Sequence, residues 1–137
     1  MNATSQDIAE MLEGQSSFGL TMAVNKQPGN LFIGREPSSP NNCVTVFDTM
    51  GFPPPLSLDS LGYELPSVQI RVRNTSYKAG FAMSHQIMTF LHGTAQLGWN
   101  GTLYSVIYCA SGPSFLDWDD NNNARFVTNF NIQRRLL

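Results

Sequence analysis

The acidic segment near the end of the sequence has the side-chain types of a calcium site. Asp117, Asp119 and Asn121 occupy the first, third and fifth positions of an EF-hand loop. That loop needs glycine at its sixth position and a bidentate glutamate at its twelfth, where this chain has Asn122 and Thr128. The spacing therefore excludes an EF-hand. We expect a solvated turn between two strands, with weak metal binding as the alternative.

The two histidines have the wrong separation for a shared zinc ion. His85 and His92 are seven residues apart on a predicted helix, which places them about 10 Å apart along its axis. No cysteine or glutamate lies between them as a further ligand. We expect His85 to make a packing or interface hydrogen bond and His92 to lie in the last turn, where the helix dipole favours it.

Motifs for nucleophilic catalysis and phosphate binding are missing from the sequence. It has no Gly-x-Ser-x-Gly elbow and no glycine-rich phosphate loop. Cys43 and Cys109 lie in apolar β patterns with no second ligand at suitable spacing. We expect both to be small buried side chains, with a disulfide or a reactive thiol as the alternative. The residues therefore predict a protein that is not an enzyme and uses no cofactor, and a His–Asp site assembled in three dimensions is the remaining catalytic hypothesis.

The bulk composition predicts a globular protein with an unusually neutral surface. A length of 137 residues fits one domain, 1–137, and 42% hydrophobic residues supply a core. Charged residues make up 13%, against a usual ~25%, so the surface costs little to desolvate and suits contact with other proteins. The net charge of −2 argues against binding nucleic acid through its phosphates. No apolar run approaches the ~20 residues of a membrane span and no signal peptide is evident, so we expect no membrane partner and folding in a cytoplasm.

Two helices are predicted to support these residues. Hydrophobic periodicity predicts a short amphipathic helix over 4–13, begun by a capping box at residues 4–7. A longer helix is expected over about 76–92, capped by Asn74 or Thr75. We expect the longer helix to bury one stripe, made of Tyr77, Gly80, Phe81, Ala82, Ile87, Met88 and Leu91.

Alternating apolar residues predict the strands. The expected strands or extended segments are 18–24, 31–33, 43–48, 68–73, 103–110 and 125–133. Turns are expected at 26–30, 99–101 and 117–123, and Gly112-Pro113 is expected to end a strand. The strand 43–48 is apolar on both sides, which predicts that both of its faces are covered. The whole pattern predicts an α+β domain with a mostly antiparallel, twisted sheet of about four to five strands, flanked by an N-terminal helix and a longer central helix.

A proline-rich loop over about 49–66 is the longest expected stretch without regular structure. Its three consecutive prolines favour an extended polyproline conformation and cannot donate hydrogen bonds to a sheet. A loop of this length in a compact domain is usually a functional arm or a flexible segment, and in so short a chain we expect it to reach a neighbouring protein. The residues that we expect to make this contact are Pro53, Pro54, Pro55, Leu56 and Tyr63. We also expect the N-terminal helix to contact a partner.

Two arginines are the charged residues of most interest. Arg71 and Arg73 lie on the polar face of the strand 68–73, about 7 Å apart. We expect this face to be wet, and a solvated surface, an inter-subunit ion pair and a pore-facing position are the three interpretations. Arg35 is a further candidate for an interaction.

Several motifs, taken in order, resemble a known family. They are Gly34-Arg-Glu-Pro37, Val44-Thr-Val-Phe-Asp48, Tyr63-Glu-Leu-Pro66, Val68-Gln-Ile-Arg-Val-Arg73 and Leu91-His-Gly93, followed by a last strand with Phe126 and Phe130 that closes in Arg134-Arg135. Over most of residues 5–135 the chain resembles the tail-terminator and minor-capsid proteins of long-tailed bacteriophages.

The resemblance implies a small structural virion protein without catalytic residues. It implies a hexameric ring that caps the tail tube, stops its polymerisation and joins the tail to the head. The implied partners are further copies of the chain, the tail tube protein and a head–tail connector or neck protein, with DNA only passing through the pore. The implied location is the tail or neck of the virion, assembled in the host cytoplasm. The alternatives are a head-completion or neck protein with the same ring logic and, less favoured, a monomeric small-ligand binding module.

Overall fold

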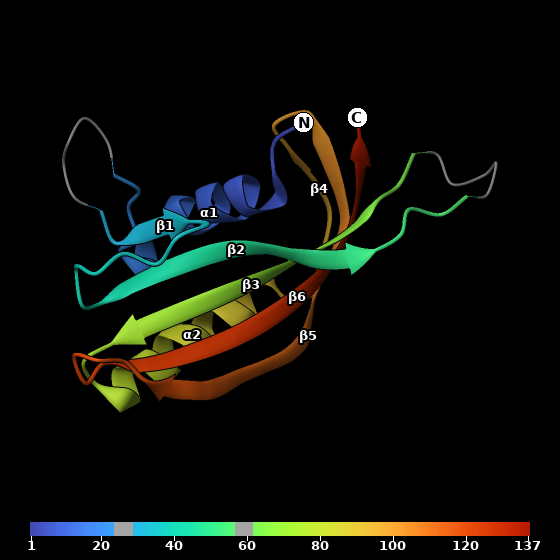
Figure 1. Ribbon diagram of the computed structural model, residues 1–137. Helices are drawn as coiled ribbons and strands as arrows, with labels where there is room; N and C mark the ends of the chain where they lie inside the picture. The colour runs from blue at the N-terminus through green and yellow to red at the C-terminus, as the bar shows by residue number, and fades with distance from the viewer. Residues whose placement is uncertain (24–28, 57–61) are drawn as a thin grey trace.

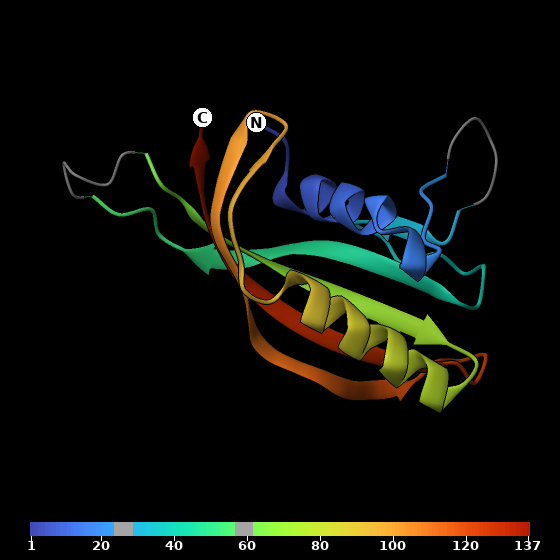
Figure 2. The ribbon, with the colours of Figure 1, turned by 180° about the vertical axis from the view of Figure 1, so that it is seen from behind.

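Two helices and a six-stranded sheet make up the protein in the computed structural model, which describes residues 1–23, 29–56 and 62–137. The helices α1 (Thr4–Gly14) and α2 (Tyr77–Leu91) lie on the same face of the sheet (Figures 1 and 2), and a 3₁₀ turn, η1 (Ser16–Phe18), follows α1. The strands are β1 (Leu31–Ile33), β2 (Cys43–Phe52), β3 (Leu65–Asn74), β4 (Thr94–Trp99), β5 (Thr102–Trp118) and β6 (Ala124–Leu136). In the described part of the chain, neither helix is long and apolar enough to cross a membrane.

The sheet places the strand that is latest in the sequence at its centre. The strand order is β1-β2-β3-β6-β5-β4, so β6 pairs with β3 on one side and β5 on the other. All neighbours are antiparallel except β1 and β2. The sheet is curled, and the turn between β4 and β5 rises beside the start of α1 (Figure 1). The α+β class, the mostly antiparallel sheet and the two helices are confirmed, but the sheet has six strands where four to five were expected.

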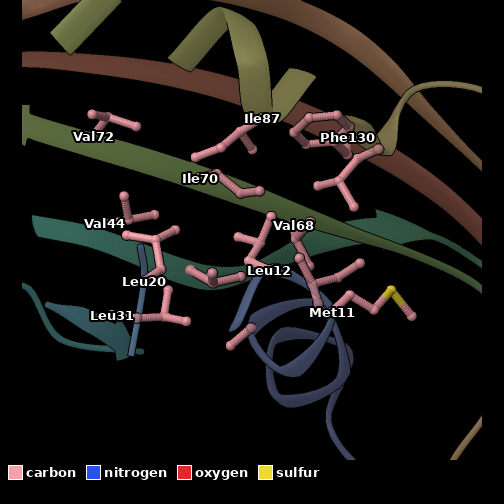
Figure 3. Packing of buried hydrophobic residues seen from close by; sticks show 14 of the residues in the cluster. Met11, Leu12, Leu20, Leu31, Val44, Val68, Ile70, Val72, Ile87 and Phe130 are labelled. Atoms are coloured by element: carbon pink, nitrogen blue, oxygen red, sulfur yellow. The ribbon is translucent and has the colours of Figure 1, made fainter. Parts of the chain in front are cut away.

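The alternation of apolar residues along β3 explains why both helices lie on one face. Val68, Ile70 and Val72 are at most 1% exposed and share one side of the strand because successive side chains point to opposite faces. Leu12 of α1 and Ile87 of α2 join them in one core (Figure 3). Burying each such side chain contributes about 1.5–3 kcal/mol, so this layer is a main source of stability. The face that points away from α1 and α2 is called the outer face below.

The expected end of a strand at Gly112-Pro113 is wrong, because β5 continues through these residues to Trp118. The pairing of β5 with β6 shifts register between Ser111 and Ser114, so the proline lies at an irregularity of the ladder. On its other side, β5 pairs with β4 only as far as Ile107. The missing proline N–H therefore costs no regular ladder bond there, as is usual for proline at an edge or bulge.

The proline-rich loop is shorter than expected. β2 continues to Phe52 and β3 begins at Leu65, so strand residues occupy both ends of the predicted stretch. Residues 57–61 of this loop lie outside the described residues.

The strand or extended segment expected at 18–24 and the turn expected at 26–30 both include residues in 24–28, which lie outside the described residues. Phe18 belongs to η1 and not to a strand, and Met22 forms a single parallel bridge to Leu31. The strand 43–48 is confirmed within β2, and its first four residues are buried as its two apolar faces predict.

The predicted buried stripe of α2 is partly wrong. The buried residues are Gly80, Ser84, Ile87 and Leu91, spaced as one helical face. Gly80 allows close packing, because a Cβ at this position would lie 2.9 Å from the ring of Phe126. The aromatic side chains at the start of the helix lie beside this face instead, with Tyr77 50% and Phe81 44% exposed. The helix cap also differs, since the Ser76 hydroxyl accepts a hydrogen bond from the Ala79 N–H.

The predicted capping box at the start of α1 is wrong. Ala3 is the N-cap and makes no side-chain hydrogen bond. The cap comes from Asp48 of β2, whose carboxylate accepts hydrogen bonds from the Ser5 backbone N–H (2.9 Å) and hydroxyl (2.6 Å). This carboxylate also faces the positive end of the helix dipole. A residue 43 positions along the chain thus fixes α1 to the sheet.

Replacing Asp48 with alanine is expected to lower the free energy of unfolding by about 1–2 kcal/mol, because α1 loses its cap and its link to β2. Asp120→Ala, in the exposed turn before β6, is the control and should change this free energy by less than about 0.5 kcal/mol. Urea unfolding followed by circular dichroism measures both variants. Equal effects of the two substitutions would show that Asp48 is not a cap.

Candidate functional site

Three arginines converge on one glutamate on the outer face of the sheet. Glu36 Oε1 accepts hydrogen bonds from Arg73 (Nη1, 3.2 Å) and Arg125 (Nη1, 3.1 Å), and its Oε2 lies 3.7 Å from Arg71 Nη1. Arg71 and Arg73 come from β3, and Arg125 lies opposite Arg73 on β6. We call these four residues the Glu36 cluster. Pairing with three cations compensates the desolvation of a glutamate side chain that is only 12% exposed.

Arg73 holds the segment between β1 and β2 against the sheet. Its Nη1 donates to the carbonyl of Pro37 (2.6 Å), its Nη2 to that of Pro40 (2.6 Å) and its Nε to that of Asn41 (3.0 Å). The residue is 4% exposed. The planar guanidinium can serve all of these acceptors at once because its donors lie in a fixed fork. Arg73 therefore contributes four of the hydrogen bonds that hold the loop carrying Glu36.

These contacts correct the expectation of a wet face at both arginines. The expectation is wrong for Arg73, which is buried and bonded within the chain. The Arg71 side chain is 25% exposed, donates to Gln69 Oε1 and lies 5.1 Å from the Phe47 ring centroid. Arg35 lies exposed in the loop beside Glu36. An inter-subunit or pore-facing role for the arginines stays a prediction, for which Arg35 and Arg71 are better placed than Arg73.

The acidic segment forms the predicted turn between two strands. Asp119 Oδ1 accepts hydrogen bonds from the backbone N–H groups of Asn121 (2.9 Å) and Asn123 (2.8 Å). Asp117 instead pairs with Arg125 through both of its oxygens, at 2.6 and 2.5 Å. This hydrogen-bonded pair lowers the pKa of Asp117 and raises that of Arg125. The carboxylates of Asp117 and Asp119 are thus committed to structural contacts.

The proline-rich segment projects from one end of the sheet as an arm (Figure 1). The base of the arm is a two-stranded ribbon in which Phe52 of β2 pairs with Leu65 of β3. Gly51 permits this close approach, because a Cβ there would lie 2.1 Å from the Leu65 carbonyl oxygen. The direction of the arm is therefore set by the sheet from which it continues.

Apolar side chains of the arm are exposed to solvent. Residues 53–56 are all exposed, and Leu56 is 100% exposed. Met50 and Phe52, on the strand that leads into the prolines, are 97% and 59% exposed. Tyr63 is half-buried, with the Arg135 guanidinium 5.8 Å from its ring centroid. The structure thus brings the predicted contact residues 53–56 together on one projection and leaves Tyr63 at its base.

The histidines and cysteines take structural positions. The His85 ring stacks on Phe81 at 6.0 Å between centroids, and His92 Nδ1 accepts a hydrogen bond from the Cys109 backbone N–H (2.9 Å). Both cysteines are free; Cys43 is buried as expected, but the expectation is wrong for Cys109, which is only half-buried. Burial raises the pKa of the Cys43 thiol away from the reactive range. Among the described residues, no group of three or more acidic, histidine or cysteine side chains lies close enough to hold a metal ion.

A buried polar network was not predicted from the sequence. The Tyr104 hydroxyl donates to Asp7 Oδ2 (2.5 Å) and accepts from Arg134 Nη1 (3.2 Å), while Arg134 Nε donates to Glu64 Oε1 (2.6 Å). Asn100 Nδ2 donates to the other Asp7 oxygen (3.0 Å). Asp7 and Tyr104 are both 0% exposed. We call this the Asp7 network, and it connects α1, β5, β6 and the base of the arm.

These surfaces combine internally paired charges with exposed apolar side chains. Arg73 and Arg125 are paired with carboxylates within the chain, whereas apolar side chains are exposed at the arm and beside α2. Residues 4–135 match the family model of the bacteriophage tail terminator protein. None of the curated proteins matches the chain. The chain therefore belongs to the bacteriophage tail terminator family, whose members are structural, non-enzymatic virion proteins that cap the phage tail.

Proposed function

We propose that this chain forms a hexameric ring on the end of the tail tube, ends the polymerisation of the tube and presents the surface that joins the tail to the head. The observation that carries this proposal is the family match over residues 4–135. The exposed apolar arm supports it, because a side chain as exposed as Leu56, at 100%, gains by packing against another protein.

The physics of ring assembly fits these tasks. A head-to-tail contact between identical subunits closes into a ring when its rotation closes, whereas stacked tube rings add without limit until a different face is presented. A terminator must therefore bind the last tube ring with one face and present another face to which no further tube ring binds. The proposed partners are other copies of the chain, the tail tube protein and a head–tail connector or neck protein, with DNA only passing through the pore.

The arm is the first candidate for partner contacts. Residues 53–56 project beyond the sheet, and Tyr63 lies at the base of the arm. The proposal also gives Arg35 and Arg71 inter-subunit or pore-facing positions, since both retain exposed surface. α1 was also expected to contact partners, but most of its residues are buried in the subunit. We place the protein in the tail or neck of the virion, after assembly in the host cytoplasm.

The mass of the purified protein, measured with and without its tail tube protein, tests the proposal. We expect a species of about six times the 15.2 kDa monomer mass, either alone or on tube ends, as a closed heterologous ring requires. Adding the protein to polymerising tube protein should shorten the tubes. A chain that stays monomeric and leaves tube length unchanged would contradict the proposal, and rings that bind a head connector but no tube would favour a neck protein instead.

A further inference from the structure

An aromatic surface lies beside the start of α2, at the end of the sheet away from the arm. Tyr77, Phe115 and Trp118 pack on one another with ring centroids 5.4 to 6.1 Å apart. Phe126 lies beneath, 5.0 Å from Tyr77 and 6.0 Å from Phe81. The four outer rings are 40–53% exposed, whereas Phe126 is 0% exposed. We call Tyr77, Phe81, Phe115 and Trp118 the aromatic patch.

The arm is proline-rich and apolar, as are segments that bind to exposed aromatic rings. Its three prolines favour the polyproline conformation, which is preformed and loses little entropy on docking. Grooves lined by exposed aromatic rings are a recurring way to bind proline-rich segments. Leu56 and Phe52, at 100% and 59% exposed, flank the prolines and add apolar anchors. Residues 50–56 are called the proline arm below.

A chain cannot place its own arm on its own patch. β3 runs ten residues from the base of the arm to the turn before α2, a distance of about 33 Å along a strand. The arm leaves the sheet at one end and points away from the body, while the aromatic patch lies at the opposite end, where α2 begins (Figures 1 and 2). The two surfaces can therefore meet only between different copies.

We propose that the proline arm of each subunit packs on the aromatic patch of the next subunit in the ring. The contact is head-to-tail, because each copy offers one arm and accepts another. A heterologous contact of this type is what a closed ring needs. The inference rests on the proposed ring and names the surfaces that close it.

The surface available supplies most of the area that a stable contact needs. Aromatic side chains bury 150–250 Å² each, so four half-exposed rings offer roughly 400 Å². The exposed side chains of Met50, Phe52 and Leu56 offer a similar area from the arm. The sum of roughly 800 Å², before the prolines are added, approaches the ~1,200 Å² of the smaller stable interfaces. An aromatic patch of roughly 400 Å² lies within the range of about 300–600 Å² for the largest apolar patch on a typical monomer, and such patches are often functional.

A mixing experiment with two complementary variants tests the proposal. Leu56→Asp damages the arm and leaves the patch intact, while Trp118→Ala damages the patch and leaves the arm intact. Each variant alone should need at least tenfold more protein to form the ring, because a central tryptophan and a buried charge both have large effects at interfaces. Mixed together, they should form pairs of twice the monomer mass and no rings, since only one intact arm can meet one intact patch.

Native mass spectrometry, in the presence of the tube protein, measures all species. Tyr108→Ala is the matched control, because Tyr108 is 41% exposed on the same strand, outside the aromatic patch, and it should form rings as the wild type does. Pair formation also shows that both variants fold. If the wild type forms rings and the variants do too, or if the mixture gives no pairs, the arm contact is overturned and the proposed function stands. A wild type that forms no ring overturns both.

Discussion

Arg73→Ala is expected to lower the free energy of unfolding by about 3–5 kcal/mol, the range observed when one partner of a buried ion pair is removed. The guanidinium is 4% exposed and donates to three carbonyls and to Glu36. Its removal leaves these acceptors without their donor and releases the loop between β1 and β2 from the sheet. Because domains of this size are stable by only about 5–15 kcal/mol, a loss of this size would unfold a large fraction of the protein on modest warming.

Arg71→Ala is the matched control for this substitution. Arg71 lies two residues away on the same strand and faces the same Glu36, but its side chain is 25% exposed and the pair is 3.7 Å apart. Such a partly exposed pair contributes about 0–1 kcal/mol. Chemical denaturation of the two variants measures the difference. Similar losses for both would mean that the Glu36 pair, and not the three carbonyl contacts, stabilises the loop.

Tyr104→Phe is expected to cost about 1.5–3 kcal/mol, because a buried carboxylate oxygen of Asp7 loses its hydrogen-bond donor. Tyr104 and Asp7 are both 0% exposed, and the bond between them is 2.5 Å. The ring itself is retained, so the packing of the core changes little. Tyr108→Phe, at a tyrosine that is 41% exposed, should change the free energy of unfolding by less than about 0.5 kcal/mol and is the control.

The same tyrosine predicts how stability changes at alkaline pH. Burial first, and then the hydrogen bond to Asp7, raise the pKa of Tyr104 far above its ordinary value of 10.0. The unfolded chain therefore ionises this group at a pH where the folded protein does not, so its contribution is complete below pH ~10 and is lost as the pH rises further. Urea unfolding at pH 8 and pH 10.5 should show a smaller decline for Tyr104→Phe than for the wild type. If the free energy of unfolding falls equally in the wild type and in Tyr104→Phe, Tyr104 is not the source of the alkaline pH dependence.

Local sequence patterns correctly predicted strands and helices that bury one face, because the buried residues then recur at regular spacing. The alternation in 68–73 gave the correct faces of β3, and its apolar side forms the core. The burial of Arg73 could not be predicted in this way, because its acceptors lie 32 to 36 residues away in a loop without periodicity. The prediction of the α1 cap was wrong for the same reason, since the capping residue Asp48 comes from a distant strand.

The arm could be predicted from local sequence, whereas the aromatic patch could not. The exposure of residues 53–56 follows from prolines that cannot join a ladder, so the sequence was sufficient. The patch required β5 to continue beyond Pro113, where a register shift between Phe115 and Asp117 lets Phe115 and Trp118 contact each other on one side. In the local sequence, the aromatic patch is indicated by nothing more than the spacing of Phe115 and Trp118, three positions apart.

The position of β6 in the sheet has a consequence for the order of events during synthesis. β6 pairs with β3 on one side and with β5 on the other, so it joins the two halves of the sheet. The hydrogen bond between Ser67 and Asn131 closes a span of 64 residues. Topologies dominated by such distant pairings fold in milliseconds to seconds. β6 emerges from the ribosome after the other five strands described, so the two halves of the sheet cannot be joined before then. Folding in this order delays completion of the sheet until β6 has been translated.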